Sequence, residues 1–126
     1  YRTNIYSVDA KGTGAGGAFT TAGDVERFWD ALLSEKLLAA ETVKDMLARH
    51  SGNGEDHYGY GIWLRPEGEA EYSPFFQGSD PGVSFISQHR LCDGLSITLM
   101  SNYGDNVWEL LEVLRAAFPQ AHKERL

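Results

Sequence analysis

Apolar and polar residues alternate through much of the second half of the sequence, which predicts β-strands. The alternation covers Tyr58–Arg65, Tyr72–Gln77, Val83–Arg90 and Leu95–Asn102, and successive side chains of a strand point to opposite faces of a sheet. Gly78–Gly82 is predicted to be a turn between the second and third segments. Asp93-Gly94 lies between the last two segments, and this pair readily adopts the positive φ of a tight hairpin. The pattern predicts an antiparallel sheet of about three to four strands.

The last two predicted strands carry apolar side chains on both faces. Phe85 and Ile86 are neighbours in the first of them and therefore point to opposite sides. In the second, Ile97 shares a face with Leu99, and Met100 lies on the opposite face. Both sides of the sheet must then be covered by other elements. Helical segments elsewhere in the chain are the candidates.

Apolar residues recur at helical spacing in three places. Thr21 and Asp24 have the spacing of a capping box, and after them apolar residues follow at i, i+3, i+4, i+7 and i+8, namely Val25, Phe28, Trp29, Leu32 and Leu33. Similar patterns predict helices over Ala40–Arg49 and Asn106–Phe118. We assign these apolar faces to the core. The predicted class is α+β, an antiparallel sheet flanked by two N-terminal helices and a C-terminal helix.

Two stretches contain partial ligand-binding patterns. Gly12–Gly17 has the G-x-G-x-x-G spacing of dinucleotide sites, but those sites need a helix that opens on the last glycine, and the predicted helix begins several residues later. His50–His57 holds two histidines and an acidic pair whose spacing matches no standard metal site. We interpret the first as a turn and the second as a solvated loop, and we expect no cofactor and no metal.

Composition limits the classes of function. The 126 residues are 42% hydrophobic, which suits a single domain over residues 1–126. The net charge of −7 disfavours nucleic-acid binding, which needs a clustered basic surface. Cys92 is the single cysteine and can form no internal disulfide. We expect no membrane association, because no apolar run approaches the roughly 20 residues that cross a bilayer and no basic-then-apolar leader begins the sequence.

Five short phrases carry a resemblance to a known family. In chain order they are Gly16–Asp24, Leu37–Thr42, Tyr58–Trp63, Gly78–Gly82 and Ser101-Asn102. Together they resemble the C-terminal part of the serine β-lactamase and penicillin-binding-protein superfamily, in the branch with class C β-lactamases, D-alanyl-D-alanine carboxypeptidases and related esterases. The resemblance implies a partial β-lactamase/transpeptidase-like fold and a bacterial parent, which could be cytoplasmic or exported.

The nucleophile that the resemblance implies is not found in these residues. Enzymes of the family attack a carbonyl with the serine of a Ser-x-x-Lys motif, assisted by Tyr-x-Asn or Ser-x-Asn, and no Ser-x-x-Lys occurs in the sequence. Ser51-Gly52-Asn53 has the letters of the second motif but follows the glycine pair Gly16-Gly17, whereas this branch places the motif before that pair. We therefore expect the N-terminal half with the nucleophile to be absent from the chain.

The third family motif, Lys-Thr-Gly or His-x-Gly, corresponds to Phe76-Gln77-Gly78. Phe76 can neither transfer a proton nor pair with a carboxylate, so a catalytic side chain is missing here. The resemblance implies a substrate-binding strand made of Phe75, Phe76, Gln77, Gly78 and Ser79, with the backbone N–H of Ser79 as the candidate oxyanion donor. Ser79 itself is not predicted to be a nucleophile, because it lies in no Gly-x-Ser-x-Gly elbow.

Two functions remain open from the sequence. The first is a C-terminal fragment of a serine β-lactamase-like hydrolase, whose parent hydrolyses amides or esters through an acyl-enzyme while the fragment alone is not catalytic. The alternative is a catalytically silent β-lactamase-like module whose groove binds a peptide or protein. Phe76 favours the second and the otherwise intact scaffold favours the first.

The predicted partners follow from the last strand. In the family this strand pairs with a strand of the N-terminal part, so Leu95–Asn102 is expected to present a bare edge here. The missing N-terminal half of a parent, a second copy of the chain, or the segment Tyr1–Lys11 could cover it. A small-molecule or peptide ligand is a further expected partner.

Overall fold

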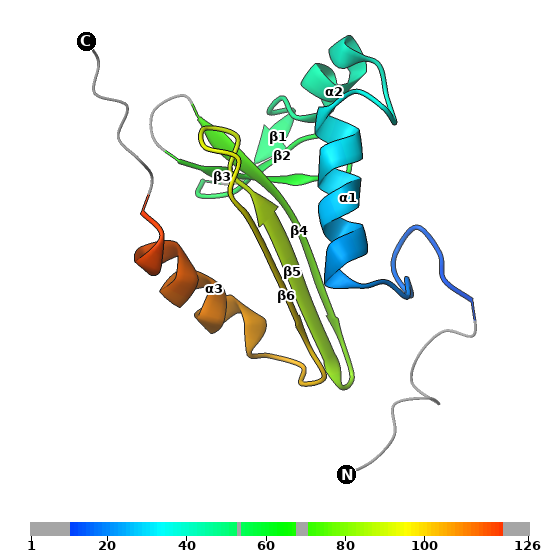
Figure 1. Ribbon diagram of the computed structural model, residues 1–126, viewed down its shortest axis with the longest axis vertical. Helices are drawn as coiled ribbons and strands as arrows, with labels where there is room; N and C mark the ends of the chain where they lie inside the picture. Colours follow the sequence, from blue (N-terminus) through cyan, green and yellow to red (C-terminus); the bar gives the residue numbers. More distant parts are fainter. Residues whose placement is uncertain (1–10, 53, 68–70, 120–126) are drawn as a thin grey trace.

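A computed structural model describes residues 11–52, 54–67 and 71–119 of the chain (Figure 1). In chain order the elements are α1 (Ala22–Leu33), α2 (Ala40–Met46), β1 (Ser51–Gly52), β2 (His57–Tyr58), β3 (Trp63–Pro66), β4 (Tyr72–Asp80), β5 (Val83–His89), β6 (Ser96–Ser101) and α3 (Val107–Ala117). The predicted α+β class, with an antiparallel sheet and three helices, is confirmed.

The sheet has six strands rather than the three or four predicted. All pair antiparallel in the order β1-β2-β3-β4-β5-β6, and the two additional strands, β1 and β2, are two residues each. The prediction of one strand over Tyr58–Arg65 is wrong in its middle. The N–H of Gly59 donates to the carbonyl of Ile62, and Gly61 has a φ of 71°, so the chain bends out of the ladder between β2 and β3.

The turn that follows β4 is shorter than predicted. Gly78 and Ser79 remain in the strand and pair with Phe85 and Ser84 of β5, so the prediction of a turn over Gly78–Gly82 is wrong in its first half. The reversal is made at the end of that segment, where Gly82 has the positive φ, 77°, that the turn requires. β4 consequently extends to Asp80.

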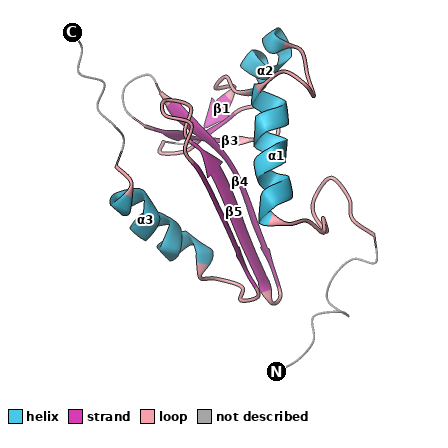
Figure 2. Ribbon diagram, viewed as in Figure 1, coloured by secondary structure: helices cyan, strands magenta, loops and turns pink. Residues whose placement is uncertain are grey.

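Helices cover both faces of the sheet, as predicted. Figure 2 shows α1 and α3 on opposite sides of the long strands β4 and β5. The α1 side holds a core of Val25, Trp29, Leu32, Val43, Ile62 and Leu64, and the α3 side holds Phe75, Ile86, Val107 and Leu111. The alternation of side chains along β4 and β5 therefore divides one sheet between two hydrophobic clusters.

The predicted capping box begins α1. The Thr21 hydroxyl accepts a hydrogen bond from the Asp24 N–H at 3.2 Å and donates to the Asp24 carboxylate at 2.9 Å. This hydroxyl, together with the charge of Arg27, holds the pKa of Asp24 below its usual value. The predictions for the other helices are too long at their ends, because α2 stops at Met46 and α3 spans Val107–Ala117.

The two stretches with partial ligand patterns form a tight turn and a short hairpin. Gly12–Gly17 contains a tight turn in which Thr13 and Gly16 exchange two backbone hydrogen bonds. The prediction of a solvated loop over His50–His57 is correct for the exposed residues Gly54–Asp56 and wrong at the ends of the segment, which contain β1 and the start of β2. His57 is 7% exposed and its ring packs against Tyr72. None of the helices in the described ranges is long and apolar enough to span a membrane.

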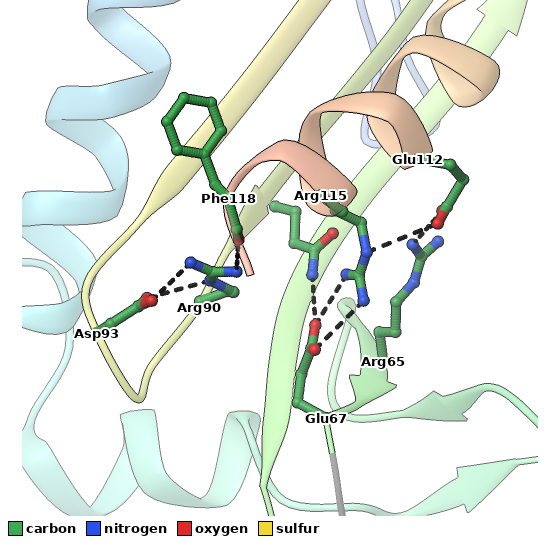
Figure 3. Close-up of polar contacts among 8 residues, drawn as sticks. Arg65, Glu67, Arg90, Asp93, Glu112, Arg115 and Phe118 are labelled. Carbon is green, nitrogen blue, oxygen red and sulfur yellow. Dashed lines mark hydrogen bonds and ion pairs between the residues drawn. The ribbon is translucent and has the colours of Figure 1, made fainter. Parts of the chain in front are cut away.

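Hydrogen bonds of a buried arginine link the C-terminal end of α3 to the loop between β5 and β6 (Figure 3). Arg90 donates to both carboxylate oxygens of Asp93, at 3.2 and 2.6 Å, and to the carbonyl of Phe118. Desolvation of the Asp93 carboxyl opposes ionisation, but the hydrogen bonds from Arg90 and from the Leu95 N–H outweigh it and lower the pKa of Asp93. The loop also shows the predicted positive φ, 74° at Gly94.

Candidate functional site

The candidate substrate-binding strand is the second half of β4, which has an open edge. β3 pairs with β4 only from Tyr72 to Phe75, whereas β5 pairs with β4 from Phe75 to Asp80. Among the described residues, no strand pairs with the other edge of β4 between Phe76 and Asp80. Backbone N–H and C=O groups on such an edge can bind an extended ligand as an additional strand.

The two phenylalanines of this strand are packed into the protein. Phe75 is 2% exposed and belongs to the cluster beneath α3. Phe76 points to the other face, where its ring centroid lies 5.2 Å from that of Trp29, 5.8 Å from that of Phe28 and 5.4 Å from that of Phe85. The Phe75 ring is therefore buried and the Phe76 ring is partly buried among aromatic side chains, so a ligand on this edge would mainly meet the backbone of these residues.

The exposed side chains between Phe76 and Asp80 are those of Gln77, Ser79 and Asp80. Trp108 of α3 donates its Nε1–H to Oε1 of Gln77 at 2.6 Å, which fixes the amide over the α3 side of the sheet. Ser79 pairs with Ser84 near the end of the ladder, and Gly78 has open space where a Cβ would lie. The strand thus offers a small, polar and positioned surface at its free edge.

His89, the histidine on the neighbouring strand β5, does not lie close to Ser79. His89 is five residues along β5 from Ser84, the pairing partner of Ser79, which corresponds to roughly 17 Å along the strand. Burial lowers the pKa of His89, and its Nδ1 is hydrogen-bonded to the Ser96 hydroxyl at 2.7 Å. His89 is therefore too far from Ser79 to activate it as a general base.

Two cavities lie elsewhere in the molecule. The larger, of about 570 Å³, is lined by Gly54, Glu55, Asp56, Arg65, Pro66, Glu112 and Arg115. The smaller, of about 350 Å³, is lined by Ser51, Gly52, Tyr58 and Trp63. Neither includes a residue from Phe75 to Ser79. The described ranges contain no group of three or more His, Cys, Asp and Glu side chains arranged to hold a metal ion.

A charged network beside the larger cavity was not predicted from the sequence. Arg115 of α3 binds both carboxylate oxygens of Glu67, at 2.8 and 3.2 Å, and Arg65 binds Glu112 at 2.8 Å (Figure 3). Gln88 also donates to Glu67, at 2.9 Å. These residues are up to 48 positions apart, and no local pattern in the sequence links them. They connect one flank of α3 to the β3 and β4 side of the sheet.

The fold and part of the sequence match a solved penicillin-binding protein. The structure of a penicillin-binding protein from Bacillus halodurans is similar with a TM-score of 0.88 and 30% sequence identity, covering 93% of this chain and 37% of that one. Over most of its length the chain is therefore similar in structure to part of a member of the serine β-lactamase and penicillin-binding-protein superfamily. The resemblance drawn from the five sequence phrases is thereby confirmed, as is a partial fold of this kind.

A second solved structure shares the fold at greater distance. It is a D-amino acid amidase from Ochrobactrum anthropi, in complex with D-phenylalanine, with a TM-score of 0.59 and 20% identity over 79% of this chain. The chain spans 37% and 35% of the lengths of these two proteins. No family model and no curated protein matches the sequence. The structural similarity of this chain is to one part of a β-lactamase-like fold.

Proposed function

We propose that this chain is the C-terminal fragment of a serine β-lactamase-like hydrolase and that it is not catalytic on its own. In this proposal it supplies one wall of the substrate cleft, and a longer parent hydrolyses amides or esters with a serine outside these residues. The observation that carries the proposal is the 30% identity and close fit to a penicillin-binding protein over 93% of the chain, in a sequence without Ser-x-x-Lys.

The free edge of β4 is what the fragment contributes to catalysis. Phe76–Asp80 has hydrogen-bonding groups without a strand partner on one side in the described chain, so an extended substrate can pair there. The N–H of Ser79 donates to the oxyanion that forms when the carbonyl is attacked. This function requires backbone geometry rather than a particular side chain, so the packing of Phe75 and Phe76 into the two cores is compatible with it.

Substitution of Ser79 by proline or by alanine distinguishes the contribution of its backbone N–H from that of its side chain. We expect Ser79→Pro to lower acylation by a fluorescent penicillin about 10²- to 10³-fold, because proline lacks the N–H that stabilises the oxyanion. Ser79→Ala retains that N–H and should stay within about twofold. In the assay this chain is co-expressed with the part of the Bacillus halodurans penicillin-binding protein that does not align with it. That part would supply the nucleophile.

Two results would contradict the proposal. Equal acylation rates for the two variants would show that the Ser79 N–H has no part in the reaction. A stable complex without any acylation would favour the second function, a catalytically silent module that binds a peptide or protein. The observation in favour of that alternative is Phe76, an apolar residue held among three aromatic rings where the family has a residue that handles charge or protons.

A further inference from the structure

The end of the sheet formed by β1, β2 and β3 carries both cavities of the molecule. Helix α3 packs mainly against β5 and β6, so its apolar side does not cover these three strands (Figure 1). They lie at the opposite end of the strand order from β6, the edge at which Tyr1–Lys11 was expected. That segment lies outside the described residues, apart from Lys11. The two cavities are therefore a feature separate from the expected covering of β6.

The two cavities adjoin along β3. Trp63 lines the smaller cavity and Arg65 the larger, and these residues lie on one face of the strand, about 7 Å apart. Both rest on the buried Phe75 ring, whose centroid is 6.3 Å from that of Trp63 and 5.1 Å from the Arg65 guanidinium carbon. The Tyr58 ring packs against Trp63 at 4.7 Å. An aromatic surface thus continues directly into a charged one.

The charged part offers groups of both signs to a ligand. Arg65 has five N–H donors, and among the described residues it makes one hydrogen bond, to Glu112 at 2.8 Å. Glu55 and Asp56 line the same cavity and are exposed. Within the described residues, their carboxylates take part in no hydrogen bond or ion pair. One guanidinium and two carboxylates therefore remain available for binding.

A ligand with charge of one sign suits this cavity poorly. An anion at Arg65 would lie in the same cavity as Glu55 and Asp56, and a cation at these carboxylates would leave the donors of Arg65 unused. The other arginine, Arg115, is already bound by both oxygens of Glu67. No group in the described ranges is arranged to hold a metal ion. A molecule that carries an ammonium and a carboxylate matches both signs.

We propose that the two cavities together bind a free aromatic amino acid as a zwitterion. Its ring packs on Tyr58 and Trp63. Its carboxylate accepts hydrogen bonds from Arg65, and its ammonium pairs with Glu55 and Asp56. The cavity volumes, about 570 and 350 Å³, are in the range of small-molecule sites. This site is distinct from the free edge of β4 and does not depend on the proposed function.

Calorimetric titration of the chain with L-phenylalanine and three analogues tests the ligand class. Phenethylamine keeps the ring and the ammonium, 3-phenylpropionate keeps the ring and the carboxylate, and alanine keeps both charges without the ring. We expect phenylalanine to bind at least about fivefold more tightly than each analogue, because each lacks one of the three contacts. An analogue that binds as tightly, or no binding of phenylalanine at millimolar concentration, would overturn the proposal.

Site variants with a matched control test the charged contacts. Arg65→Gln should weaken phenylalanine binding at least about fivefold. The control, Arg27→Gln, also removes one ion pair, that with Asp24 on α1, and should leave binding within about twofold. The double variant Glu55→Gln and Asp56→Asn changes exposed residues, so the chain should fold. It should weaken phenylalanine binding but tighten 3-phenylpropionate binding, because the repulsion of the carboxylate is removed.

Tryptophan fluorescence tests where the ring binds. Trp63 is 38% exposed, whereas Trp29 is fully buried, so ligand binding should change the emission of Trp63. We expect Trp63→Phe to abolish this change while calorimetry still detects binding, because the new ring can pack in the same place. An emission change that persists in Trp63→Phe, or phenylalanine binding that neither Arg65→Gln nor the double variant alters, would contradict the proposal. Inorganic phosphate that competes with phenylalanine and requires Arg65 would assign the cavity to an anion instead. The chain alone is used throughout, so the outcome is independent of acylation.

Discussion

Replacement of Gly59 by alanine is expected to destabilise the protein by about 3 kcal/mol or more. A Cβ at this position would lie 2.1 Å from the carbonyl oxygen of Met46 and 3.2 Å from that of Ala48. The distance to the Met46 oxygen is far shorter than a van der Waals contact. This oxygen belongs to the backbone, so it cannot move away by a change of side-chain rotamer. The same carbonyl of Met46 accepts the N–H of Tyr60 at 3.0 Å, so relief of the clash would also break this hydrogen bond. Overpacking of this severity costs at least the roughly 1 to 3 kcal/mol seen for milder cases.

The measurement is urea unfolding of the Gly59→Ala chain, with Gly14→Ala as the matched control. Gly14 has no atom within 4 Å of its ideal Cβ position and is not among the glycines with positive φ. The control should therefore change the free energy of unfolding by no more than about 0.5 kcal/mol. A loss of less than about 1 kcal/mol for Gly59→Ala would contradict the close approach of α2 to the β2–β3 connection.

Trp29→Ala is expected to lower the free energy of unfolding by about 3 to 5 kcal/mol. The indole is fully buried at 0% exposure and lies between α1 and the sheet. Its Nε1–H donates to the Ser87 hydroxyl at 2.8 Å, and its ring centroid is 5.2 Å from that of Phe76. Truncation would leave a cavity between the two layers and remove the aromatic contacts that hold Phe76 on this face.

Two further variants separate the contributions of the Trp29 ring, its hydrogen bond and the neighbouring Phe28 to the free energy of unfolding. Trp29→Phe keeps most of the ring and removes the hydrogen bond, and it should cost less than alanine because Ser87 still has Thr98 as a partner at 2.8 Å. Phe28→Ala, on the neighbouring and partly exposed position, should cost less than Trp29→Ala. Equal losses for Phe28→Ala and Trp29→Ala, measured by thermal or urea unfolding, would show that α1 packs on the sheet through a different face.

The parts of the fold predicted from the sequence are those that local patterns specify. The capping box at Thr21 and Asp24 fixes the start of α1, and the period of Val25, Trp29 and Leu32 fixes its buried side. The break between β2 and β3 was missed because it depends on the contact of Gly59 with Met46, which only the folded chain brings together. The alternation of Tyr58–Arg65 gives no signal of this bend.

The sequence predicted that the candidate site lies on a strand, but it did not predict which side chains pack around that strand. The alternation over Tyr72–Gln77 indicated an extended segment that was expected to turn at Gly78, and the resemblance indicated a substrate-binding strand that reaches Ser79. The alternation of Phe75 and Phe76 places them on opposite faces, but it does not say which side chains of the covering helices each ring meets. That information lies in Trp29 and Leu111, which are distant from the strand in the sequence, so the burial of Phe75 and the partial burial of Phe76 could not be predicted locally.

The central claim is that this polypeptide shapes a cleft wall without an attacking group of its own. Incubation of the chain alone with a fluorescent penicillin and a chromogenic cephalosporin, followed by intact mass measurement, tests it most directly, with an intact penicillin-binding protein as the positive control. We expect no hydrolysis and an unchanged mass for the chain. A stoichiometric acyl adduct on any of its serines, Ser79 above all, would contradict the claim.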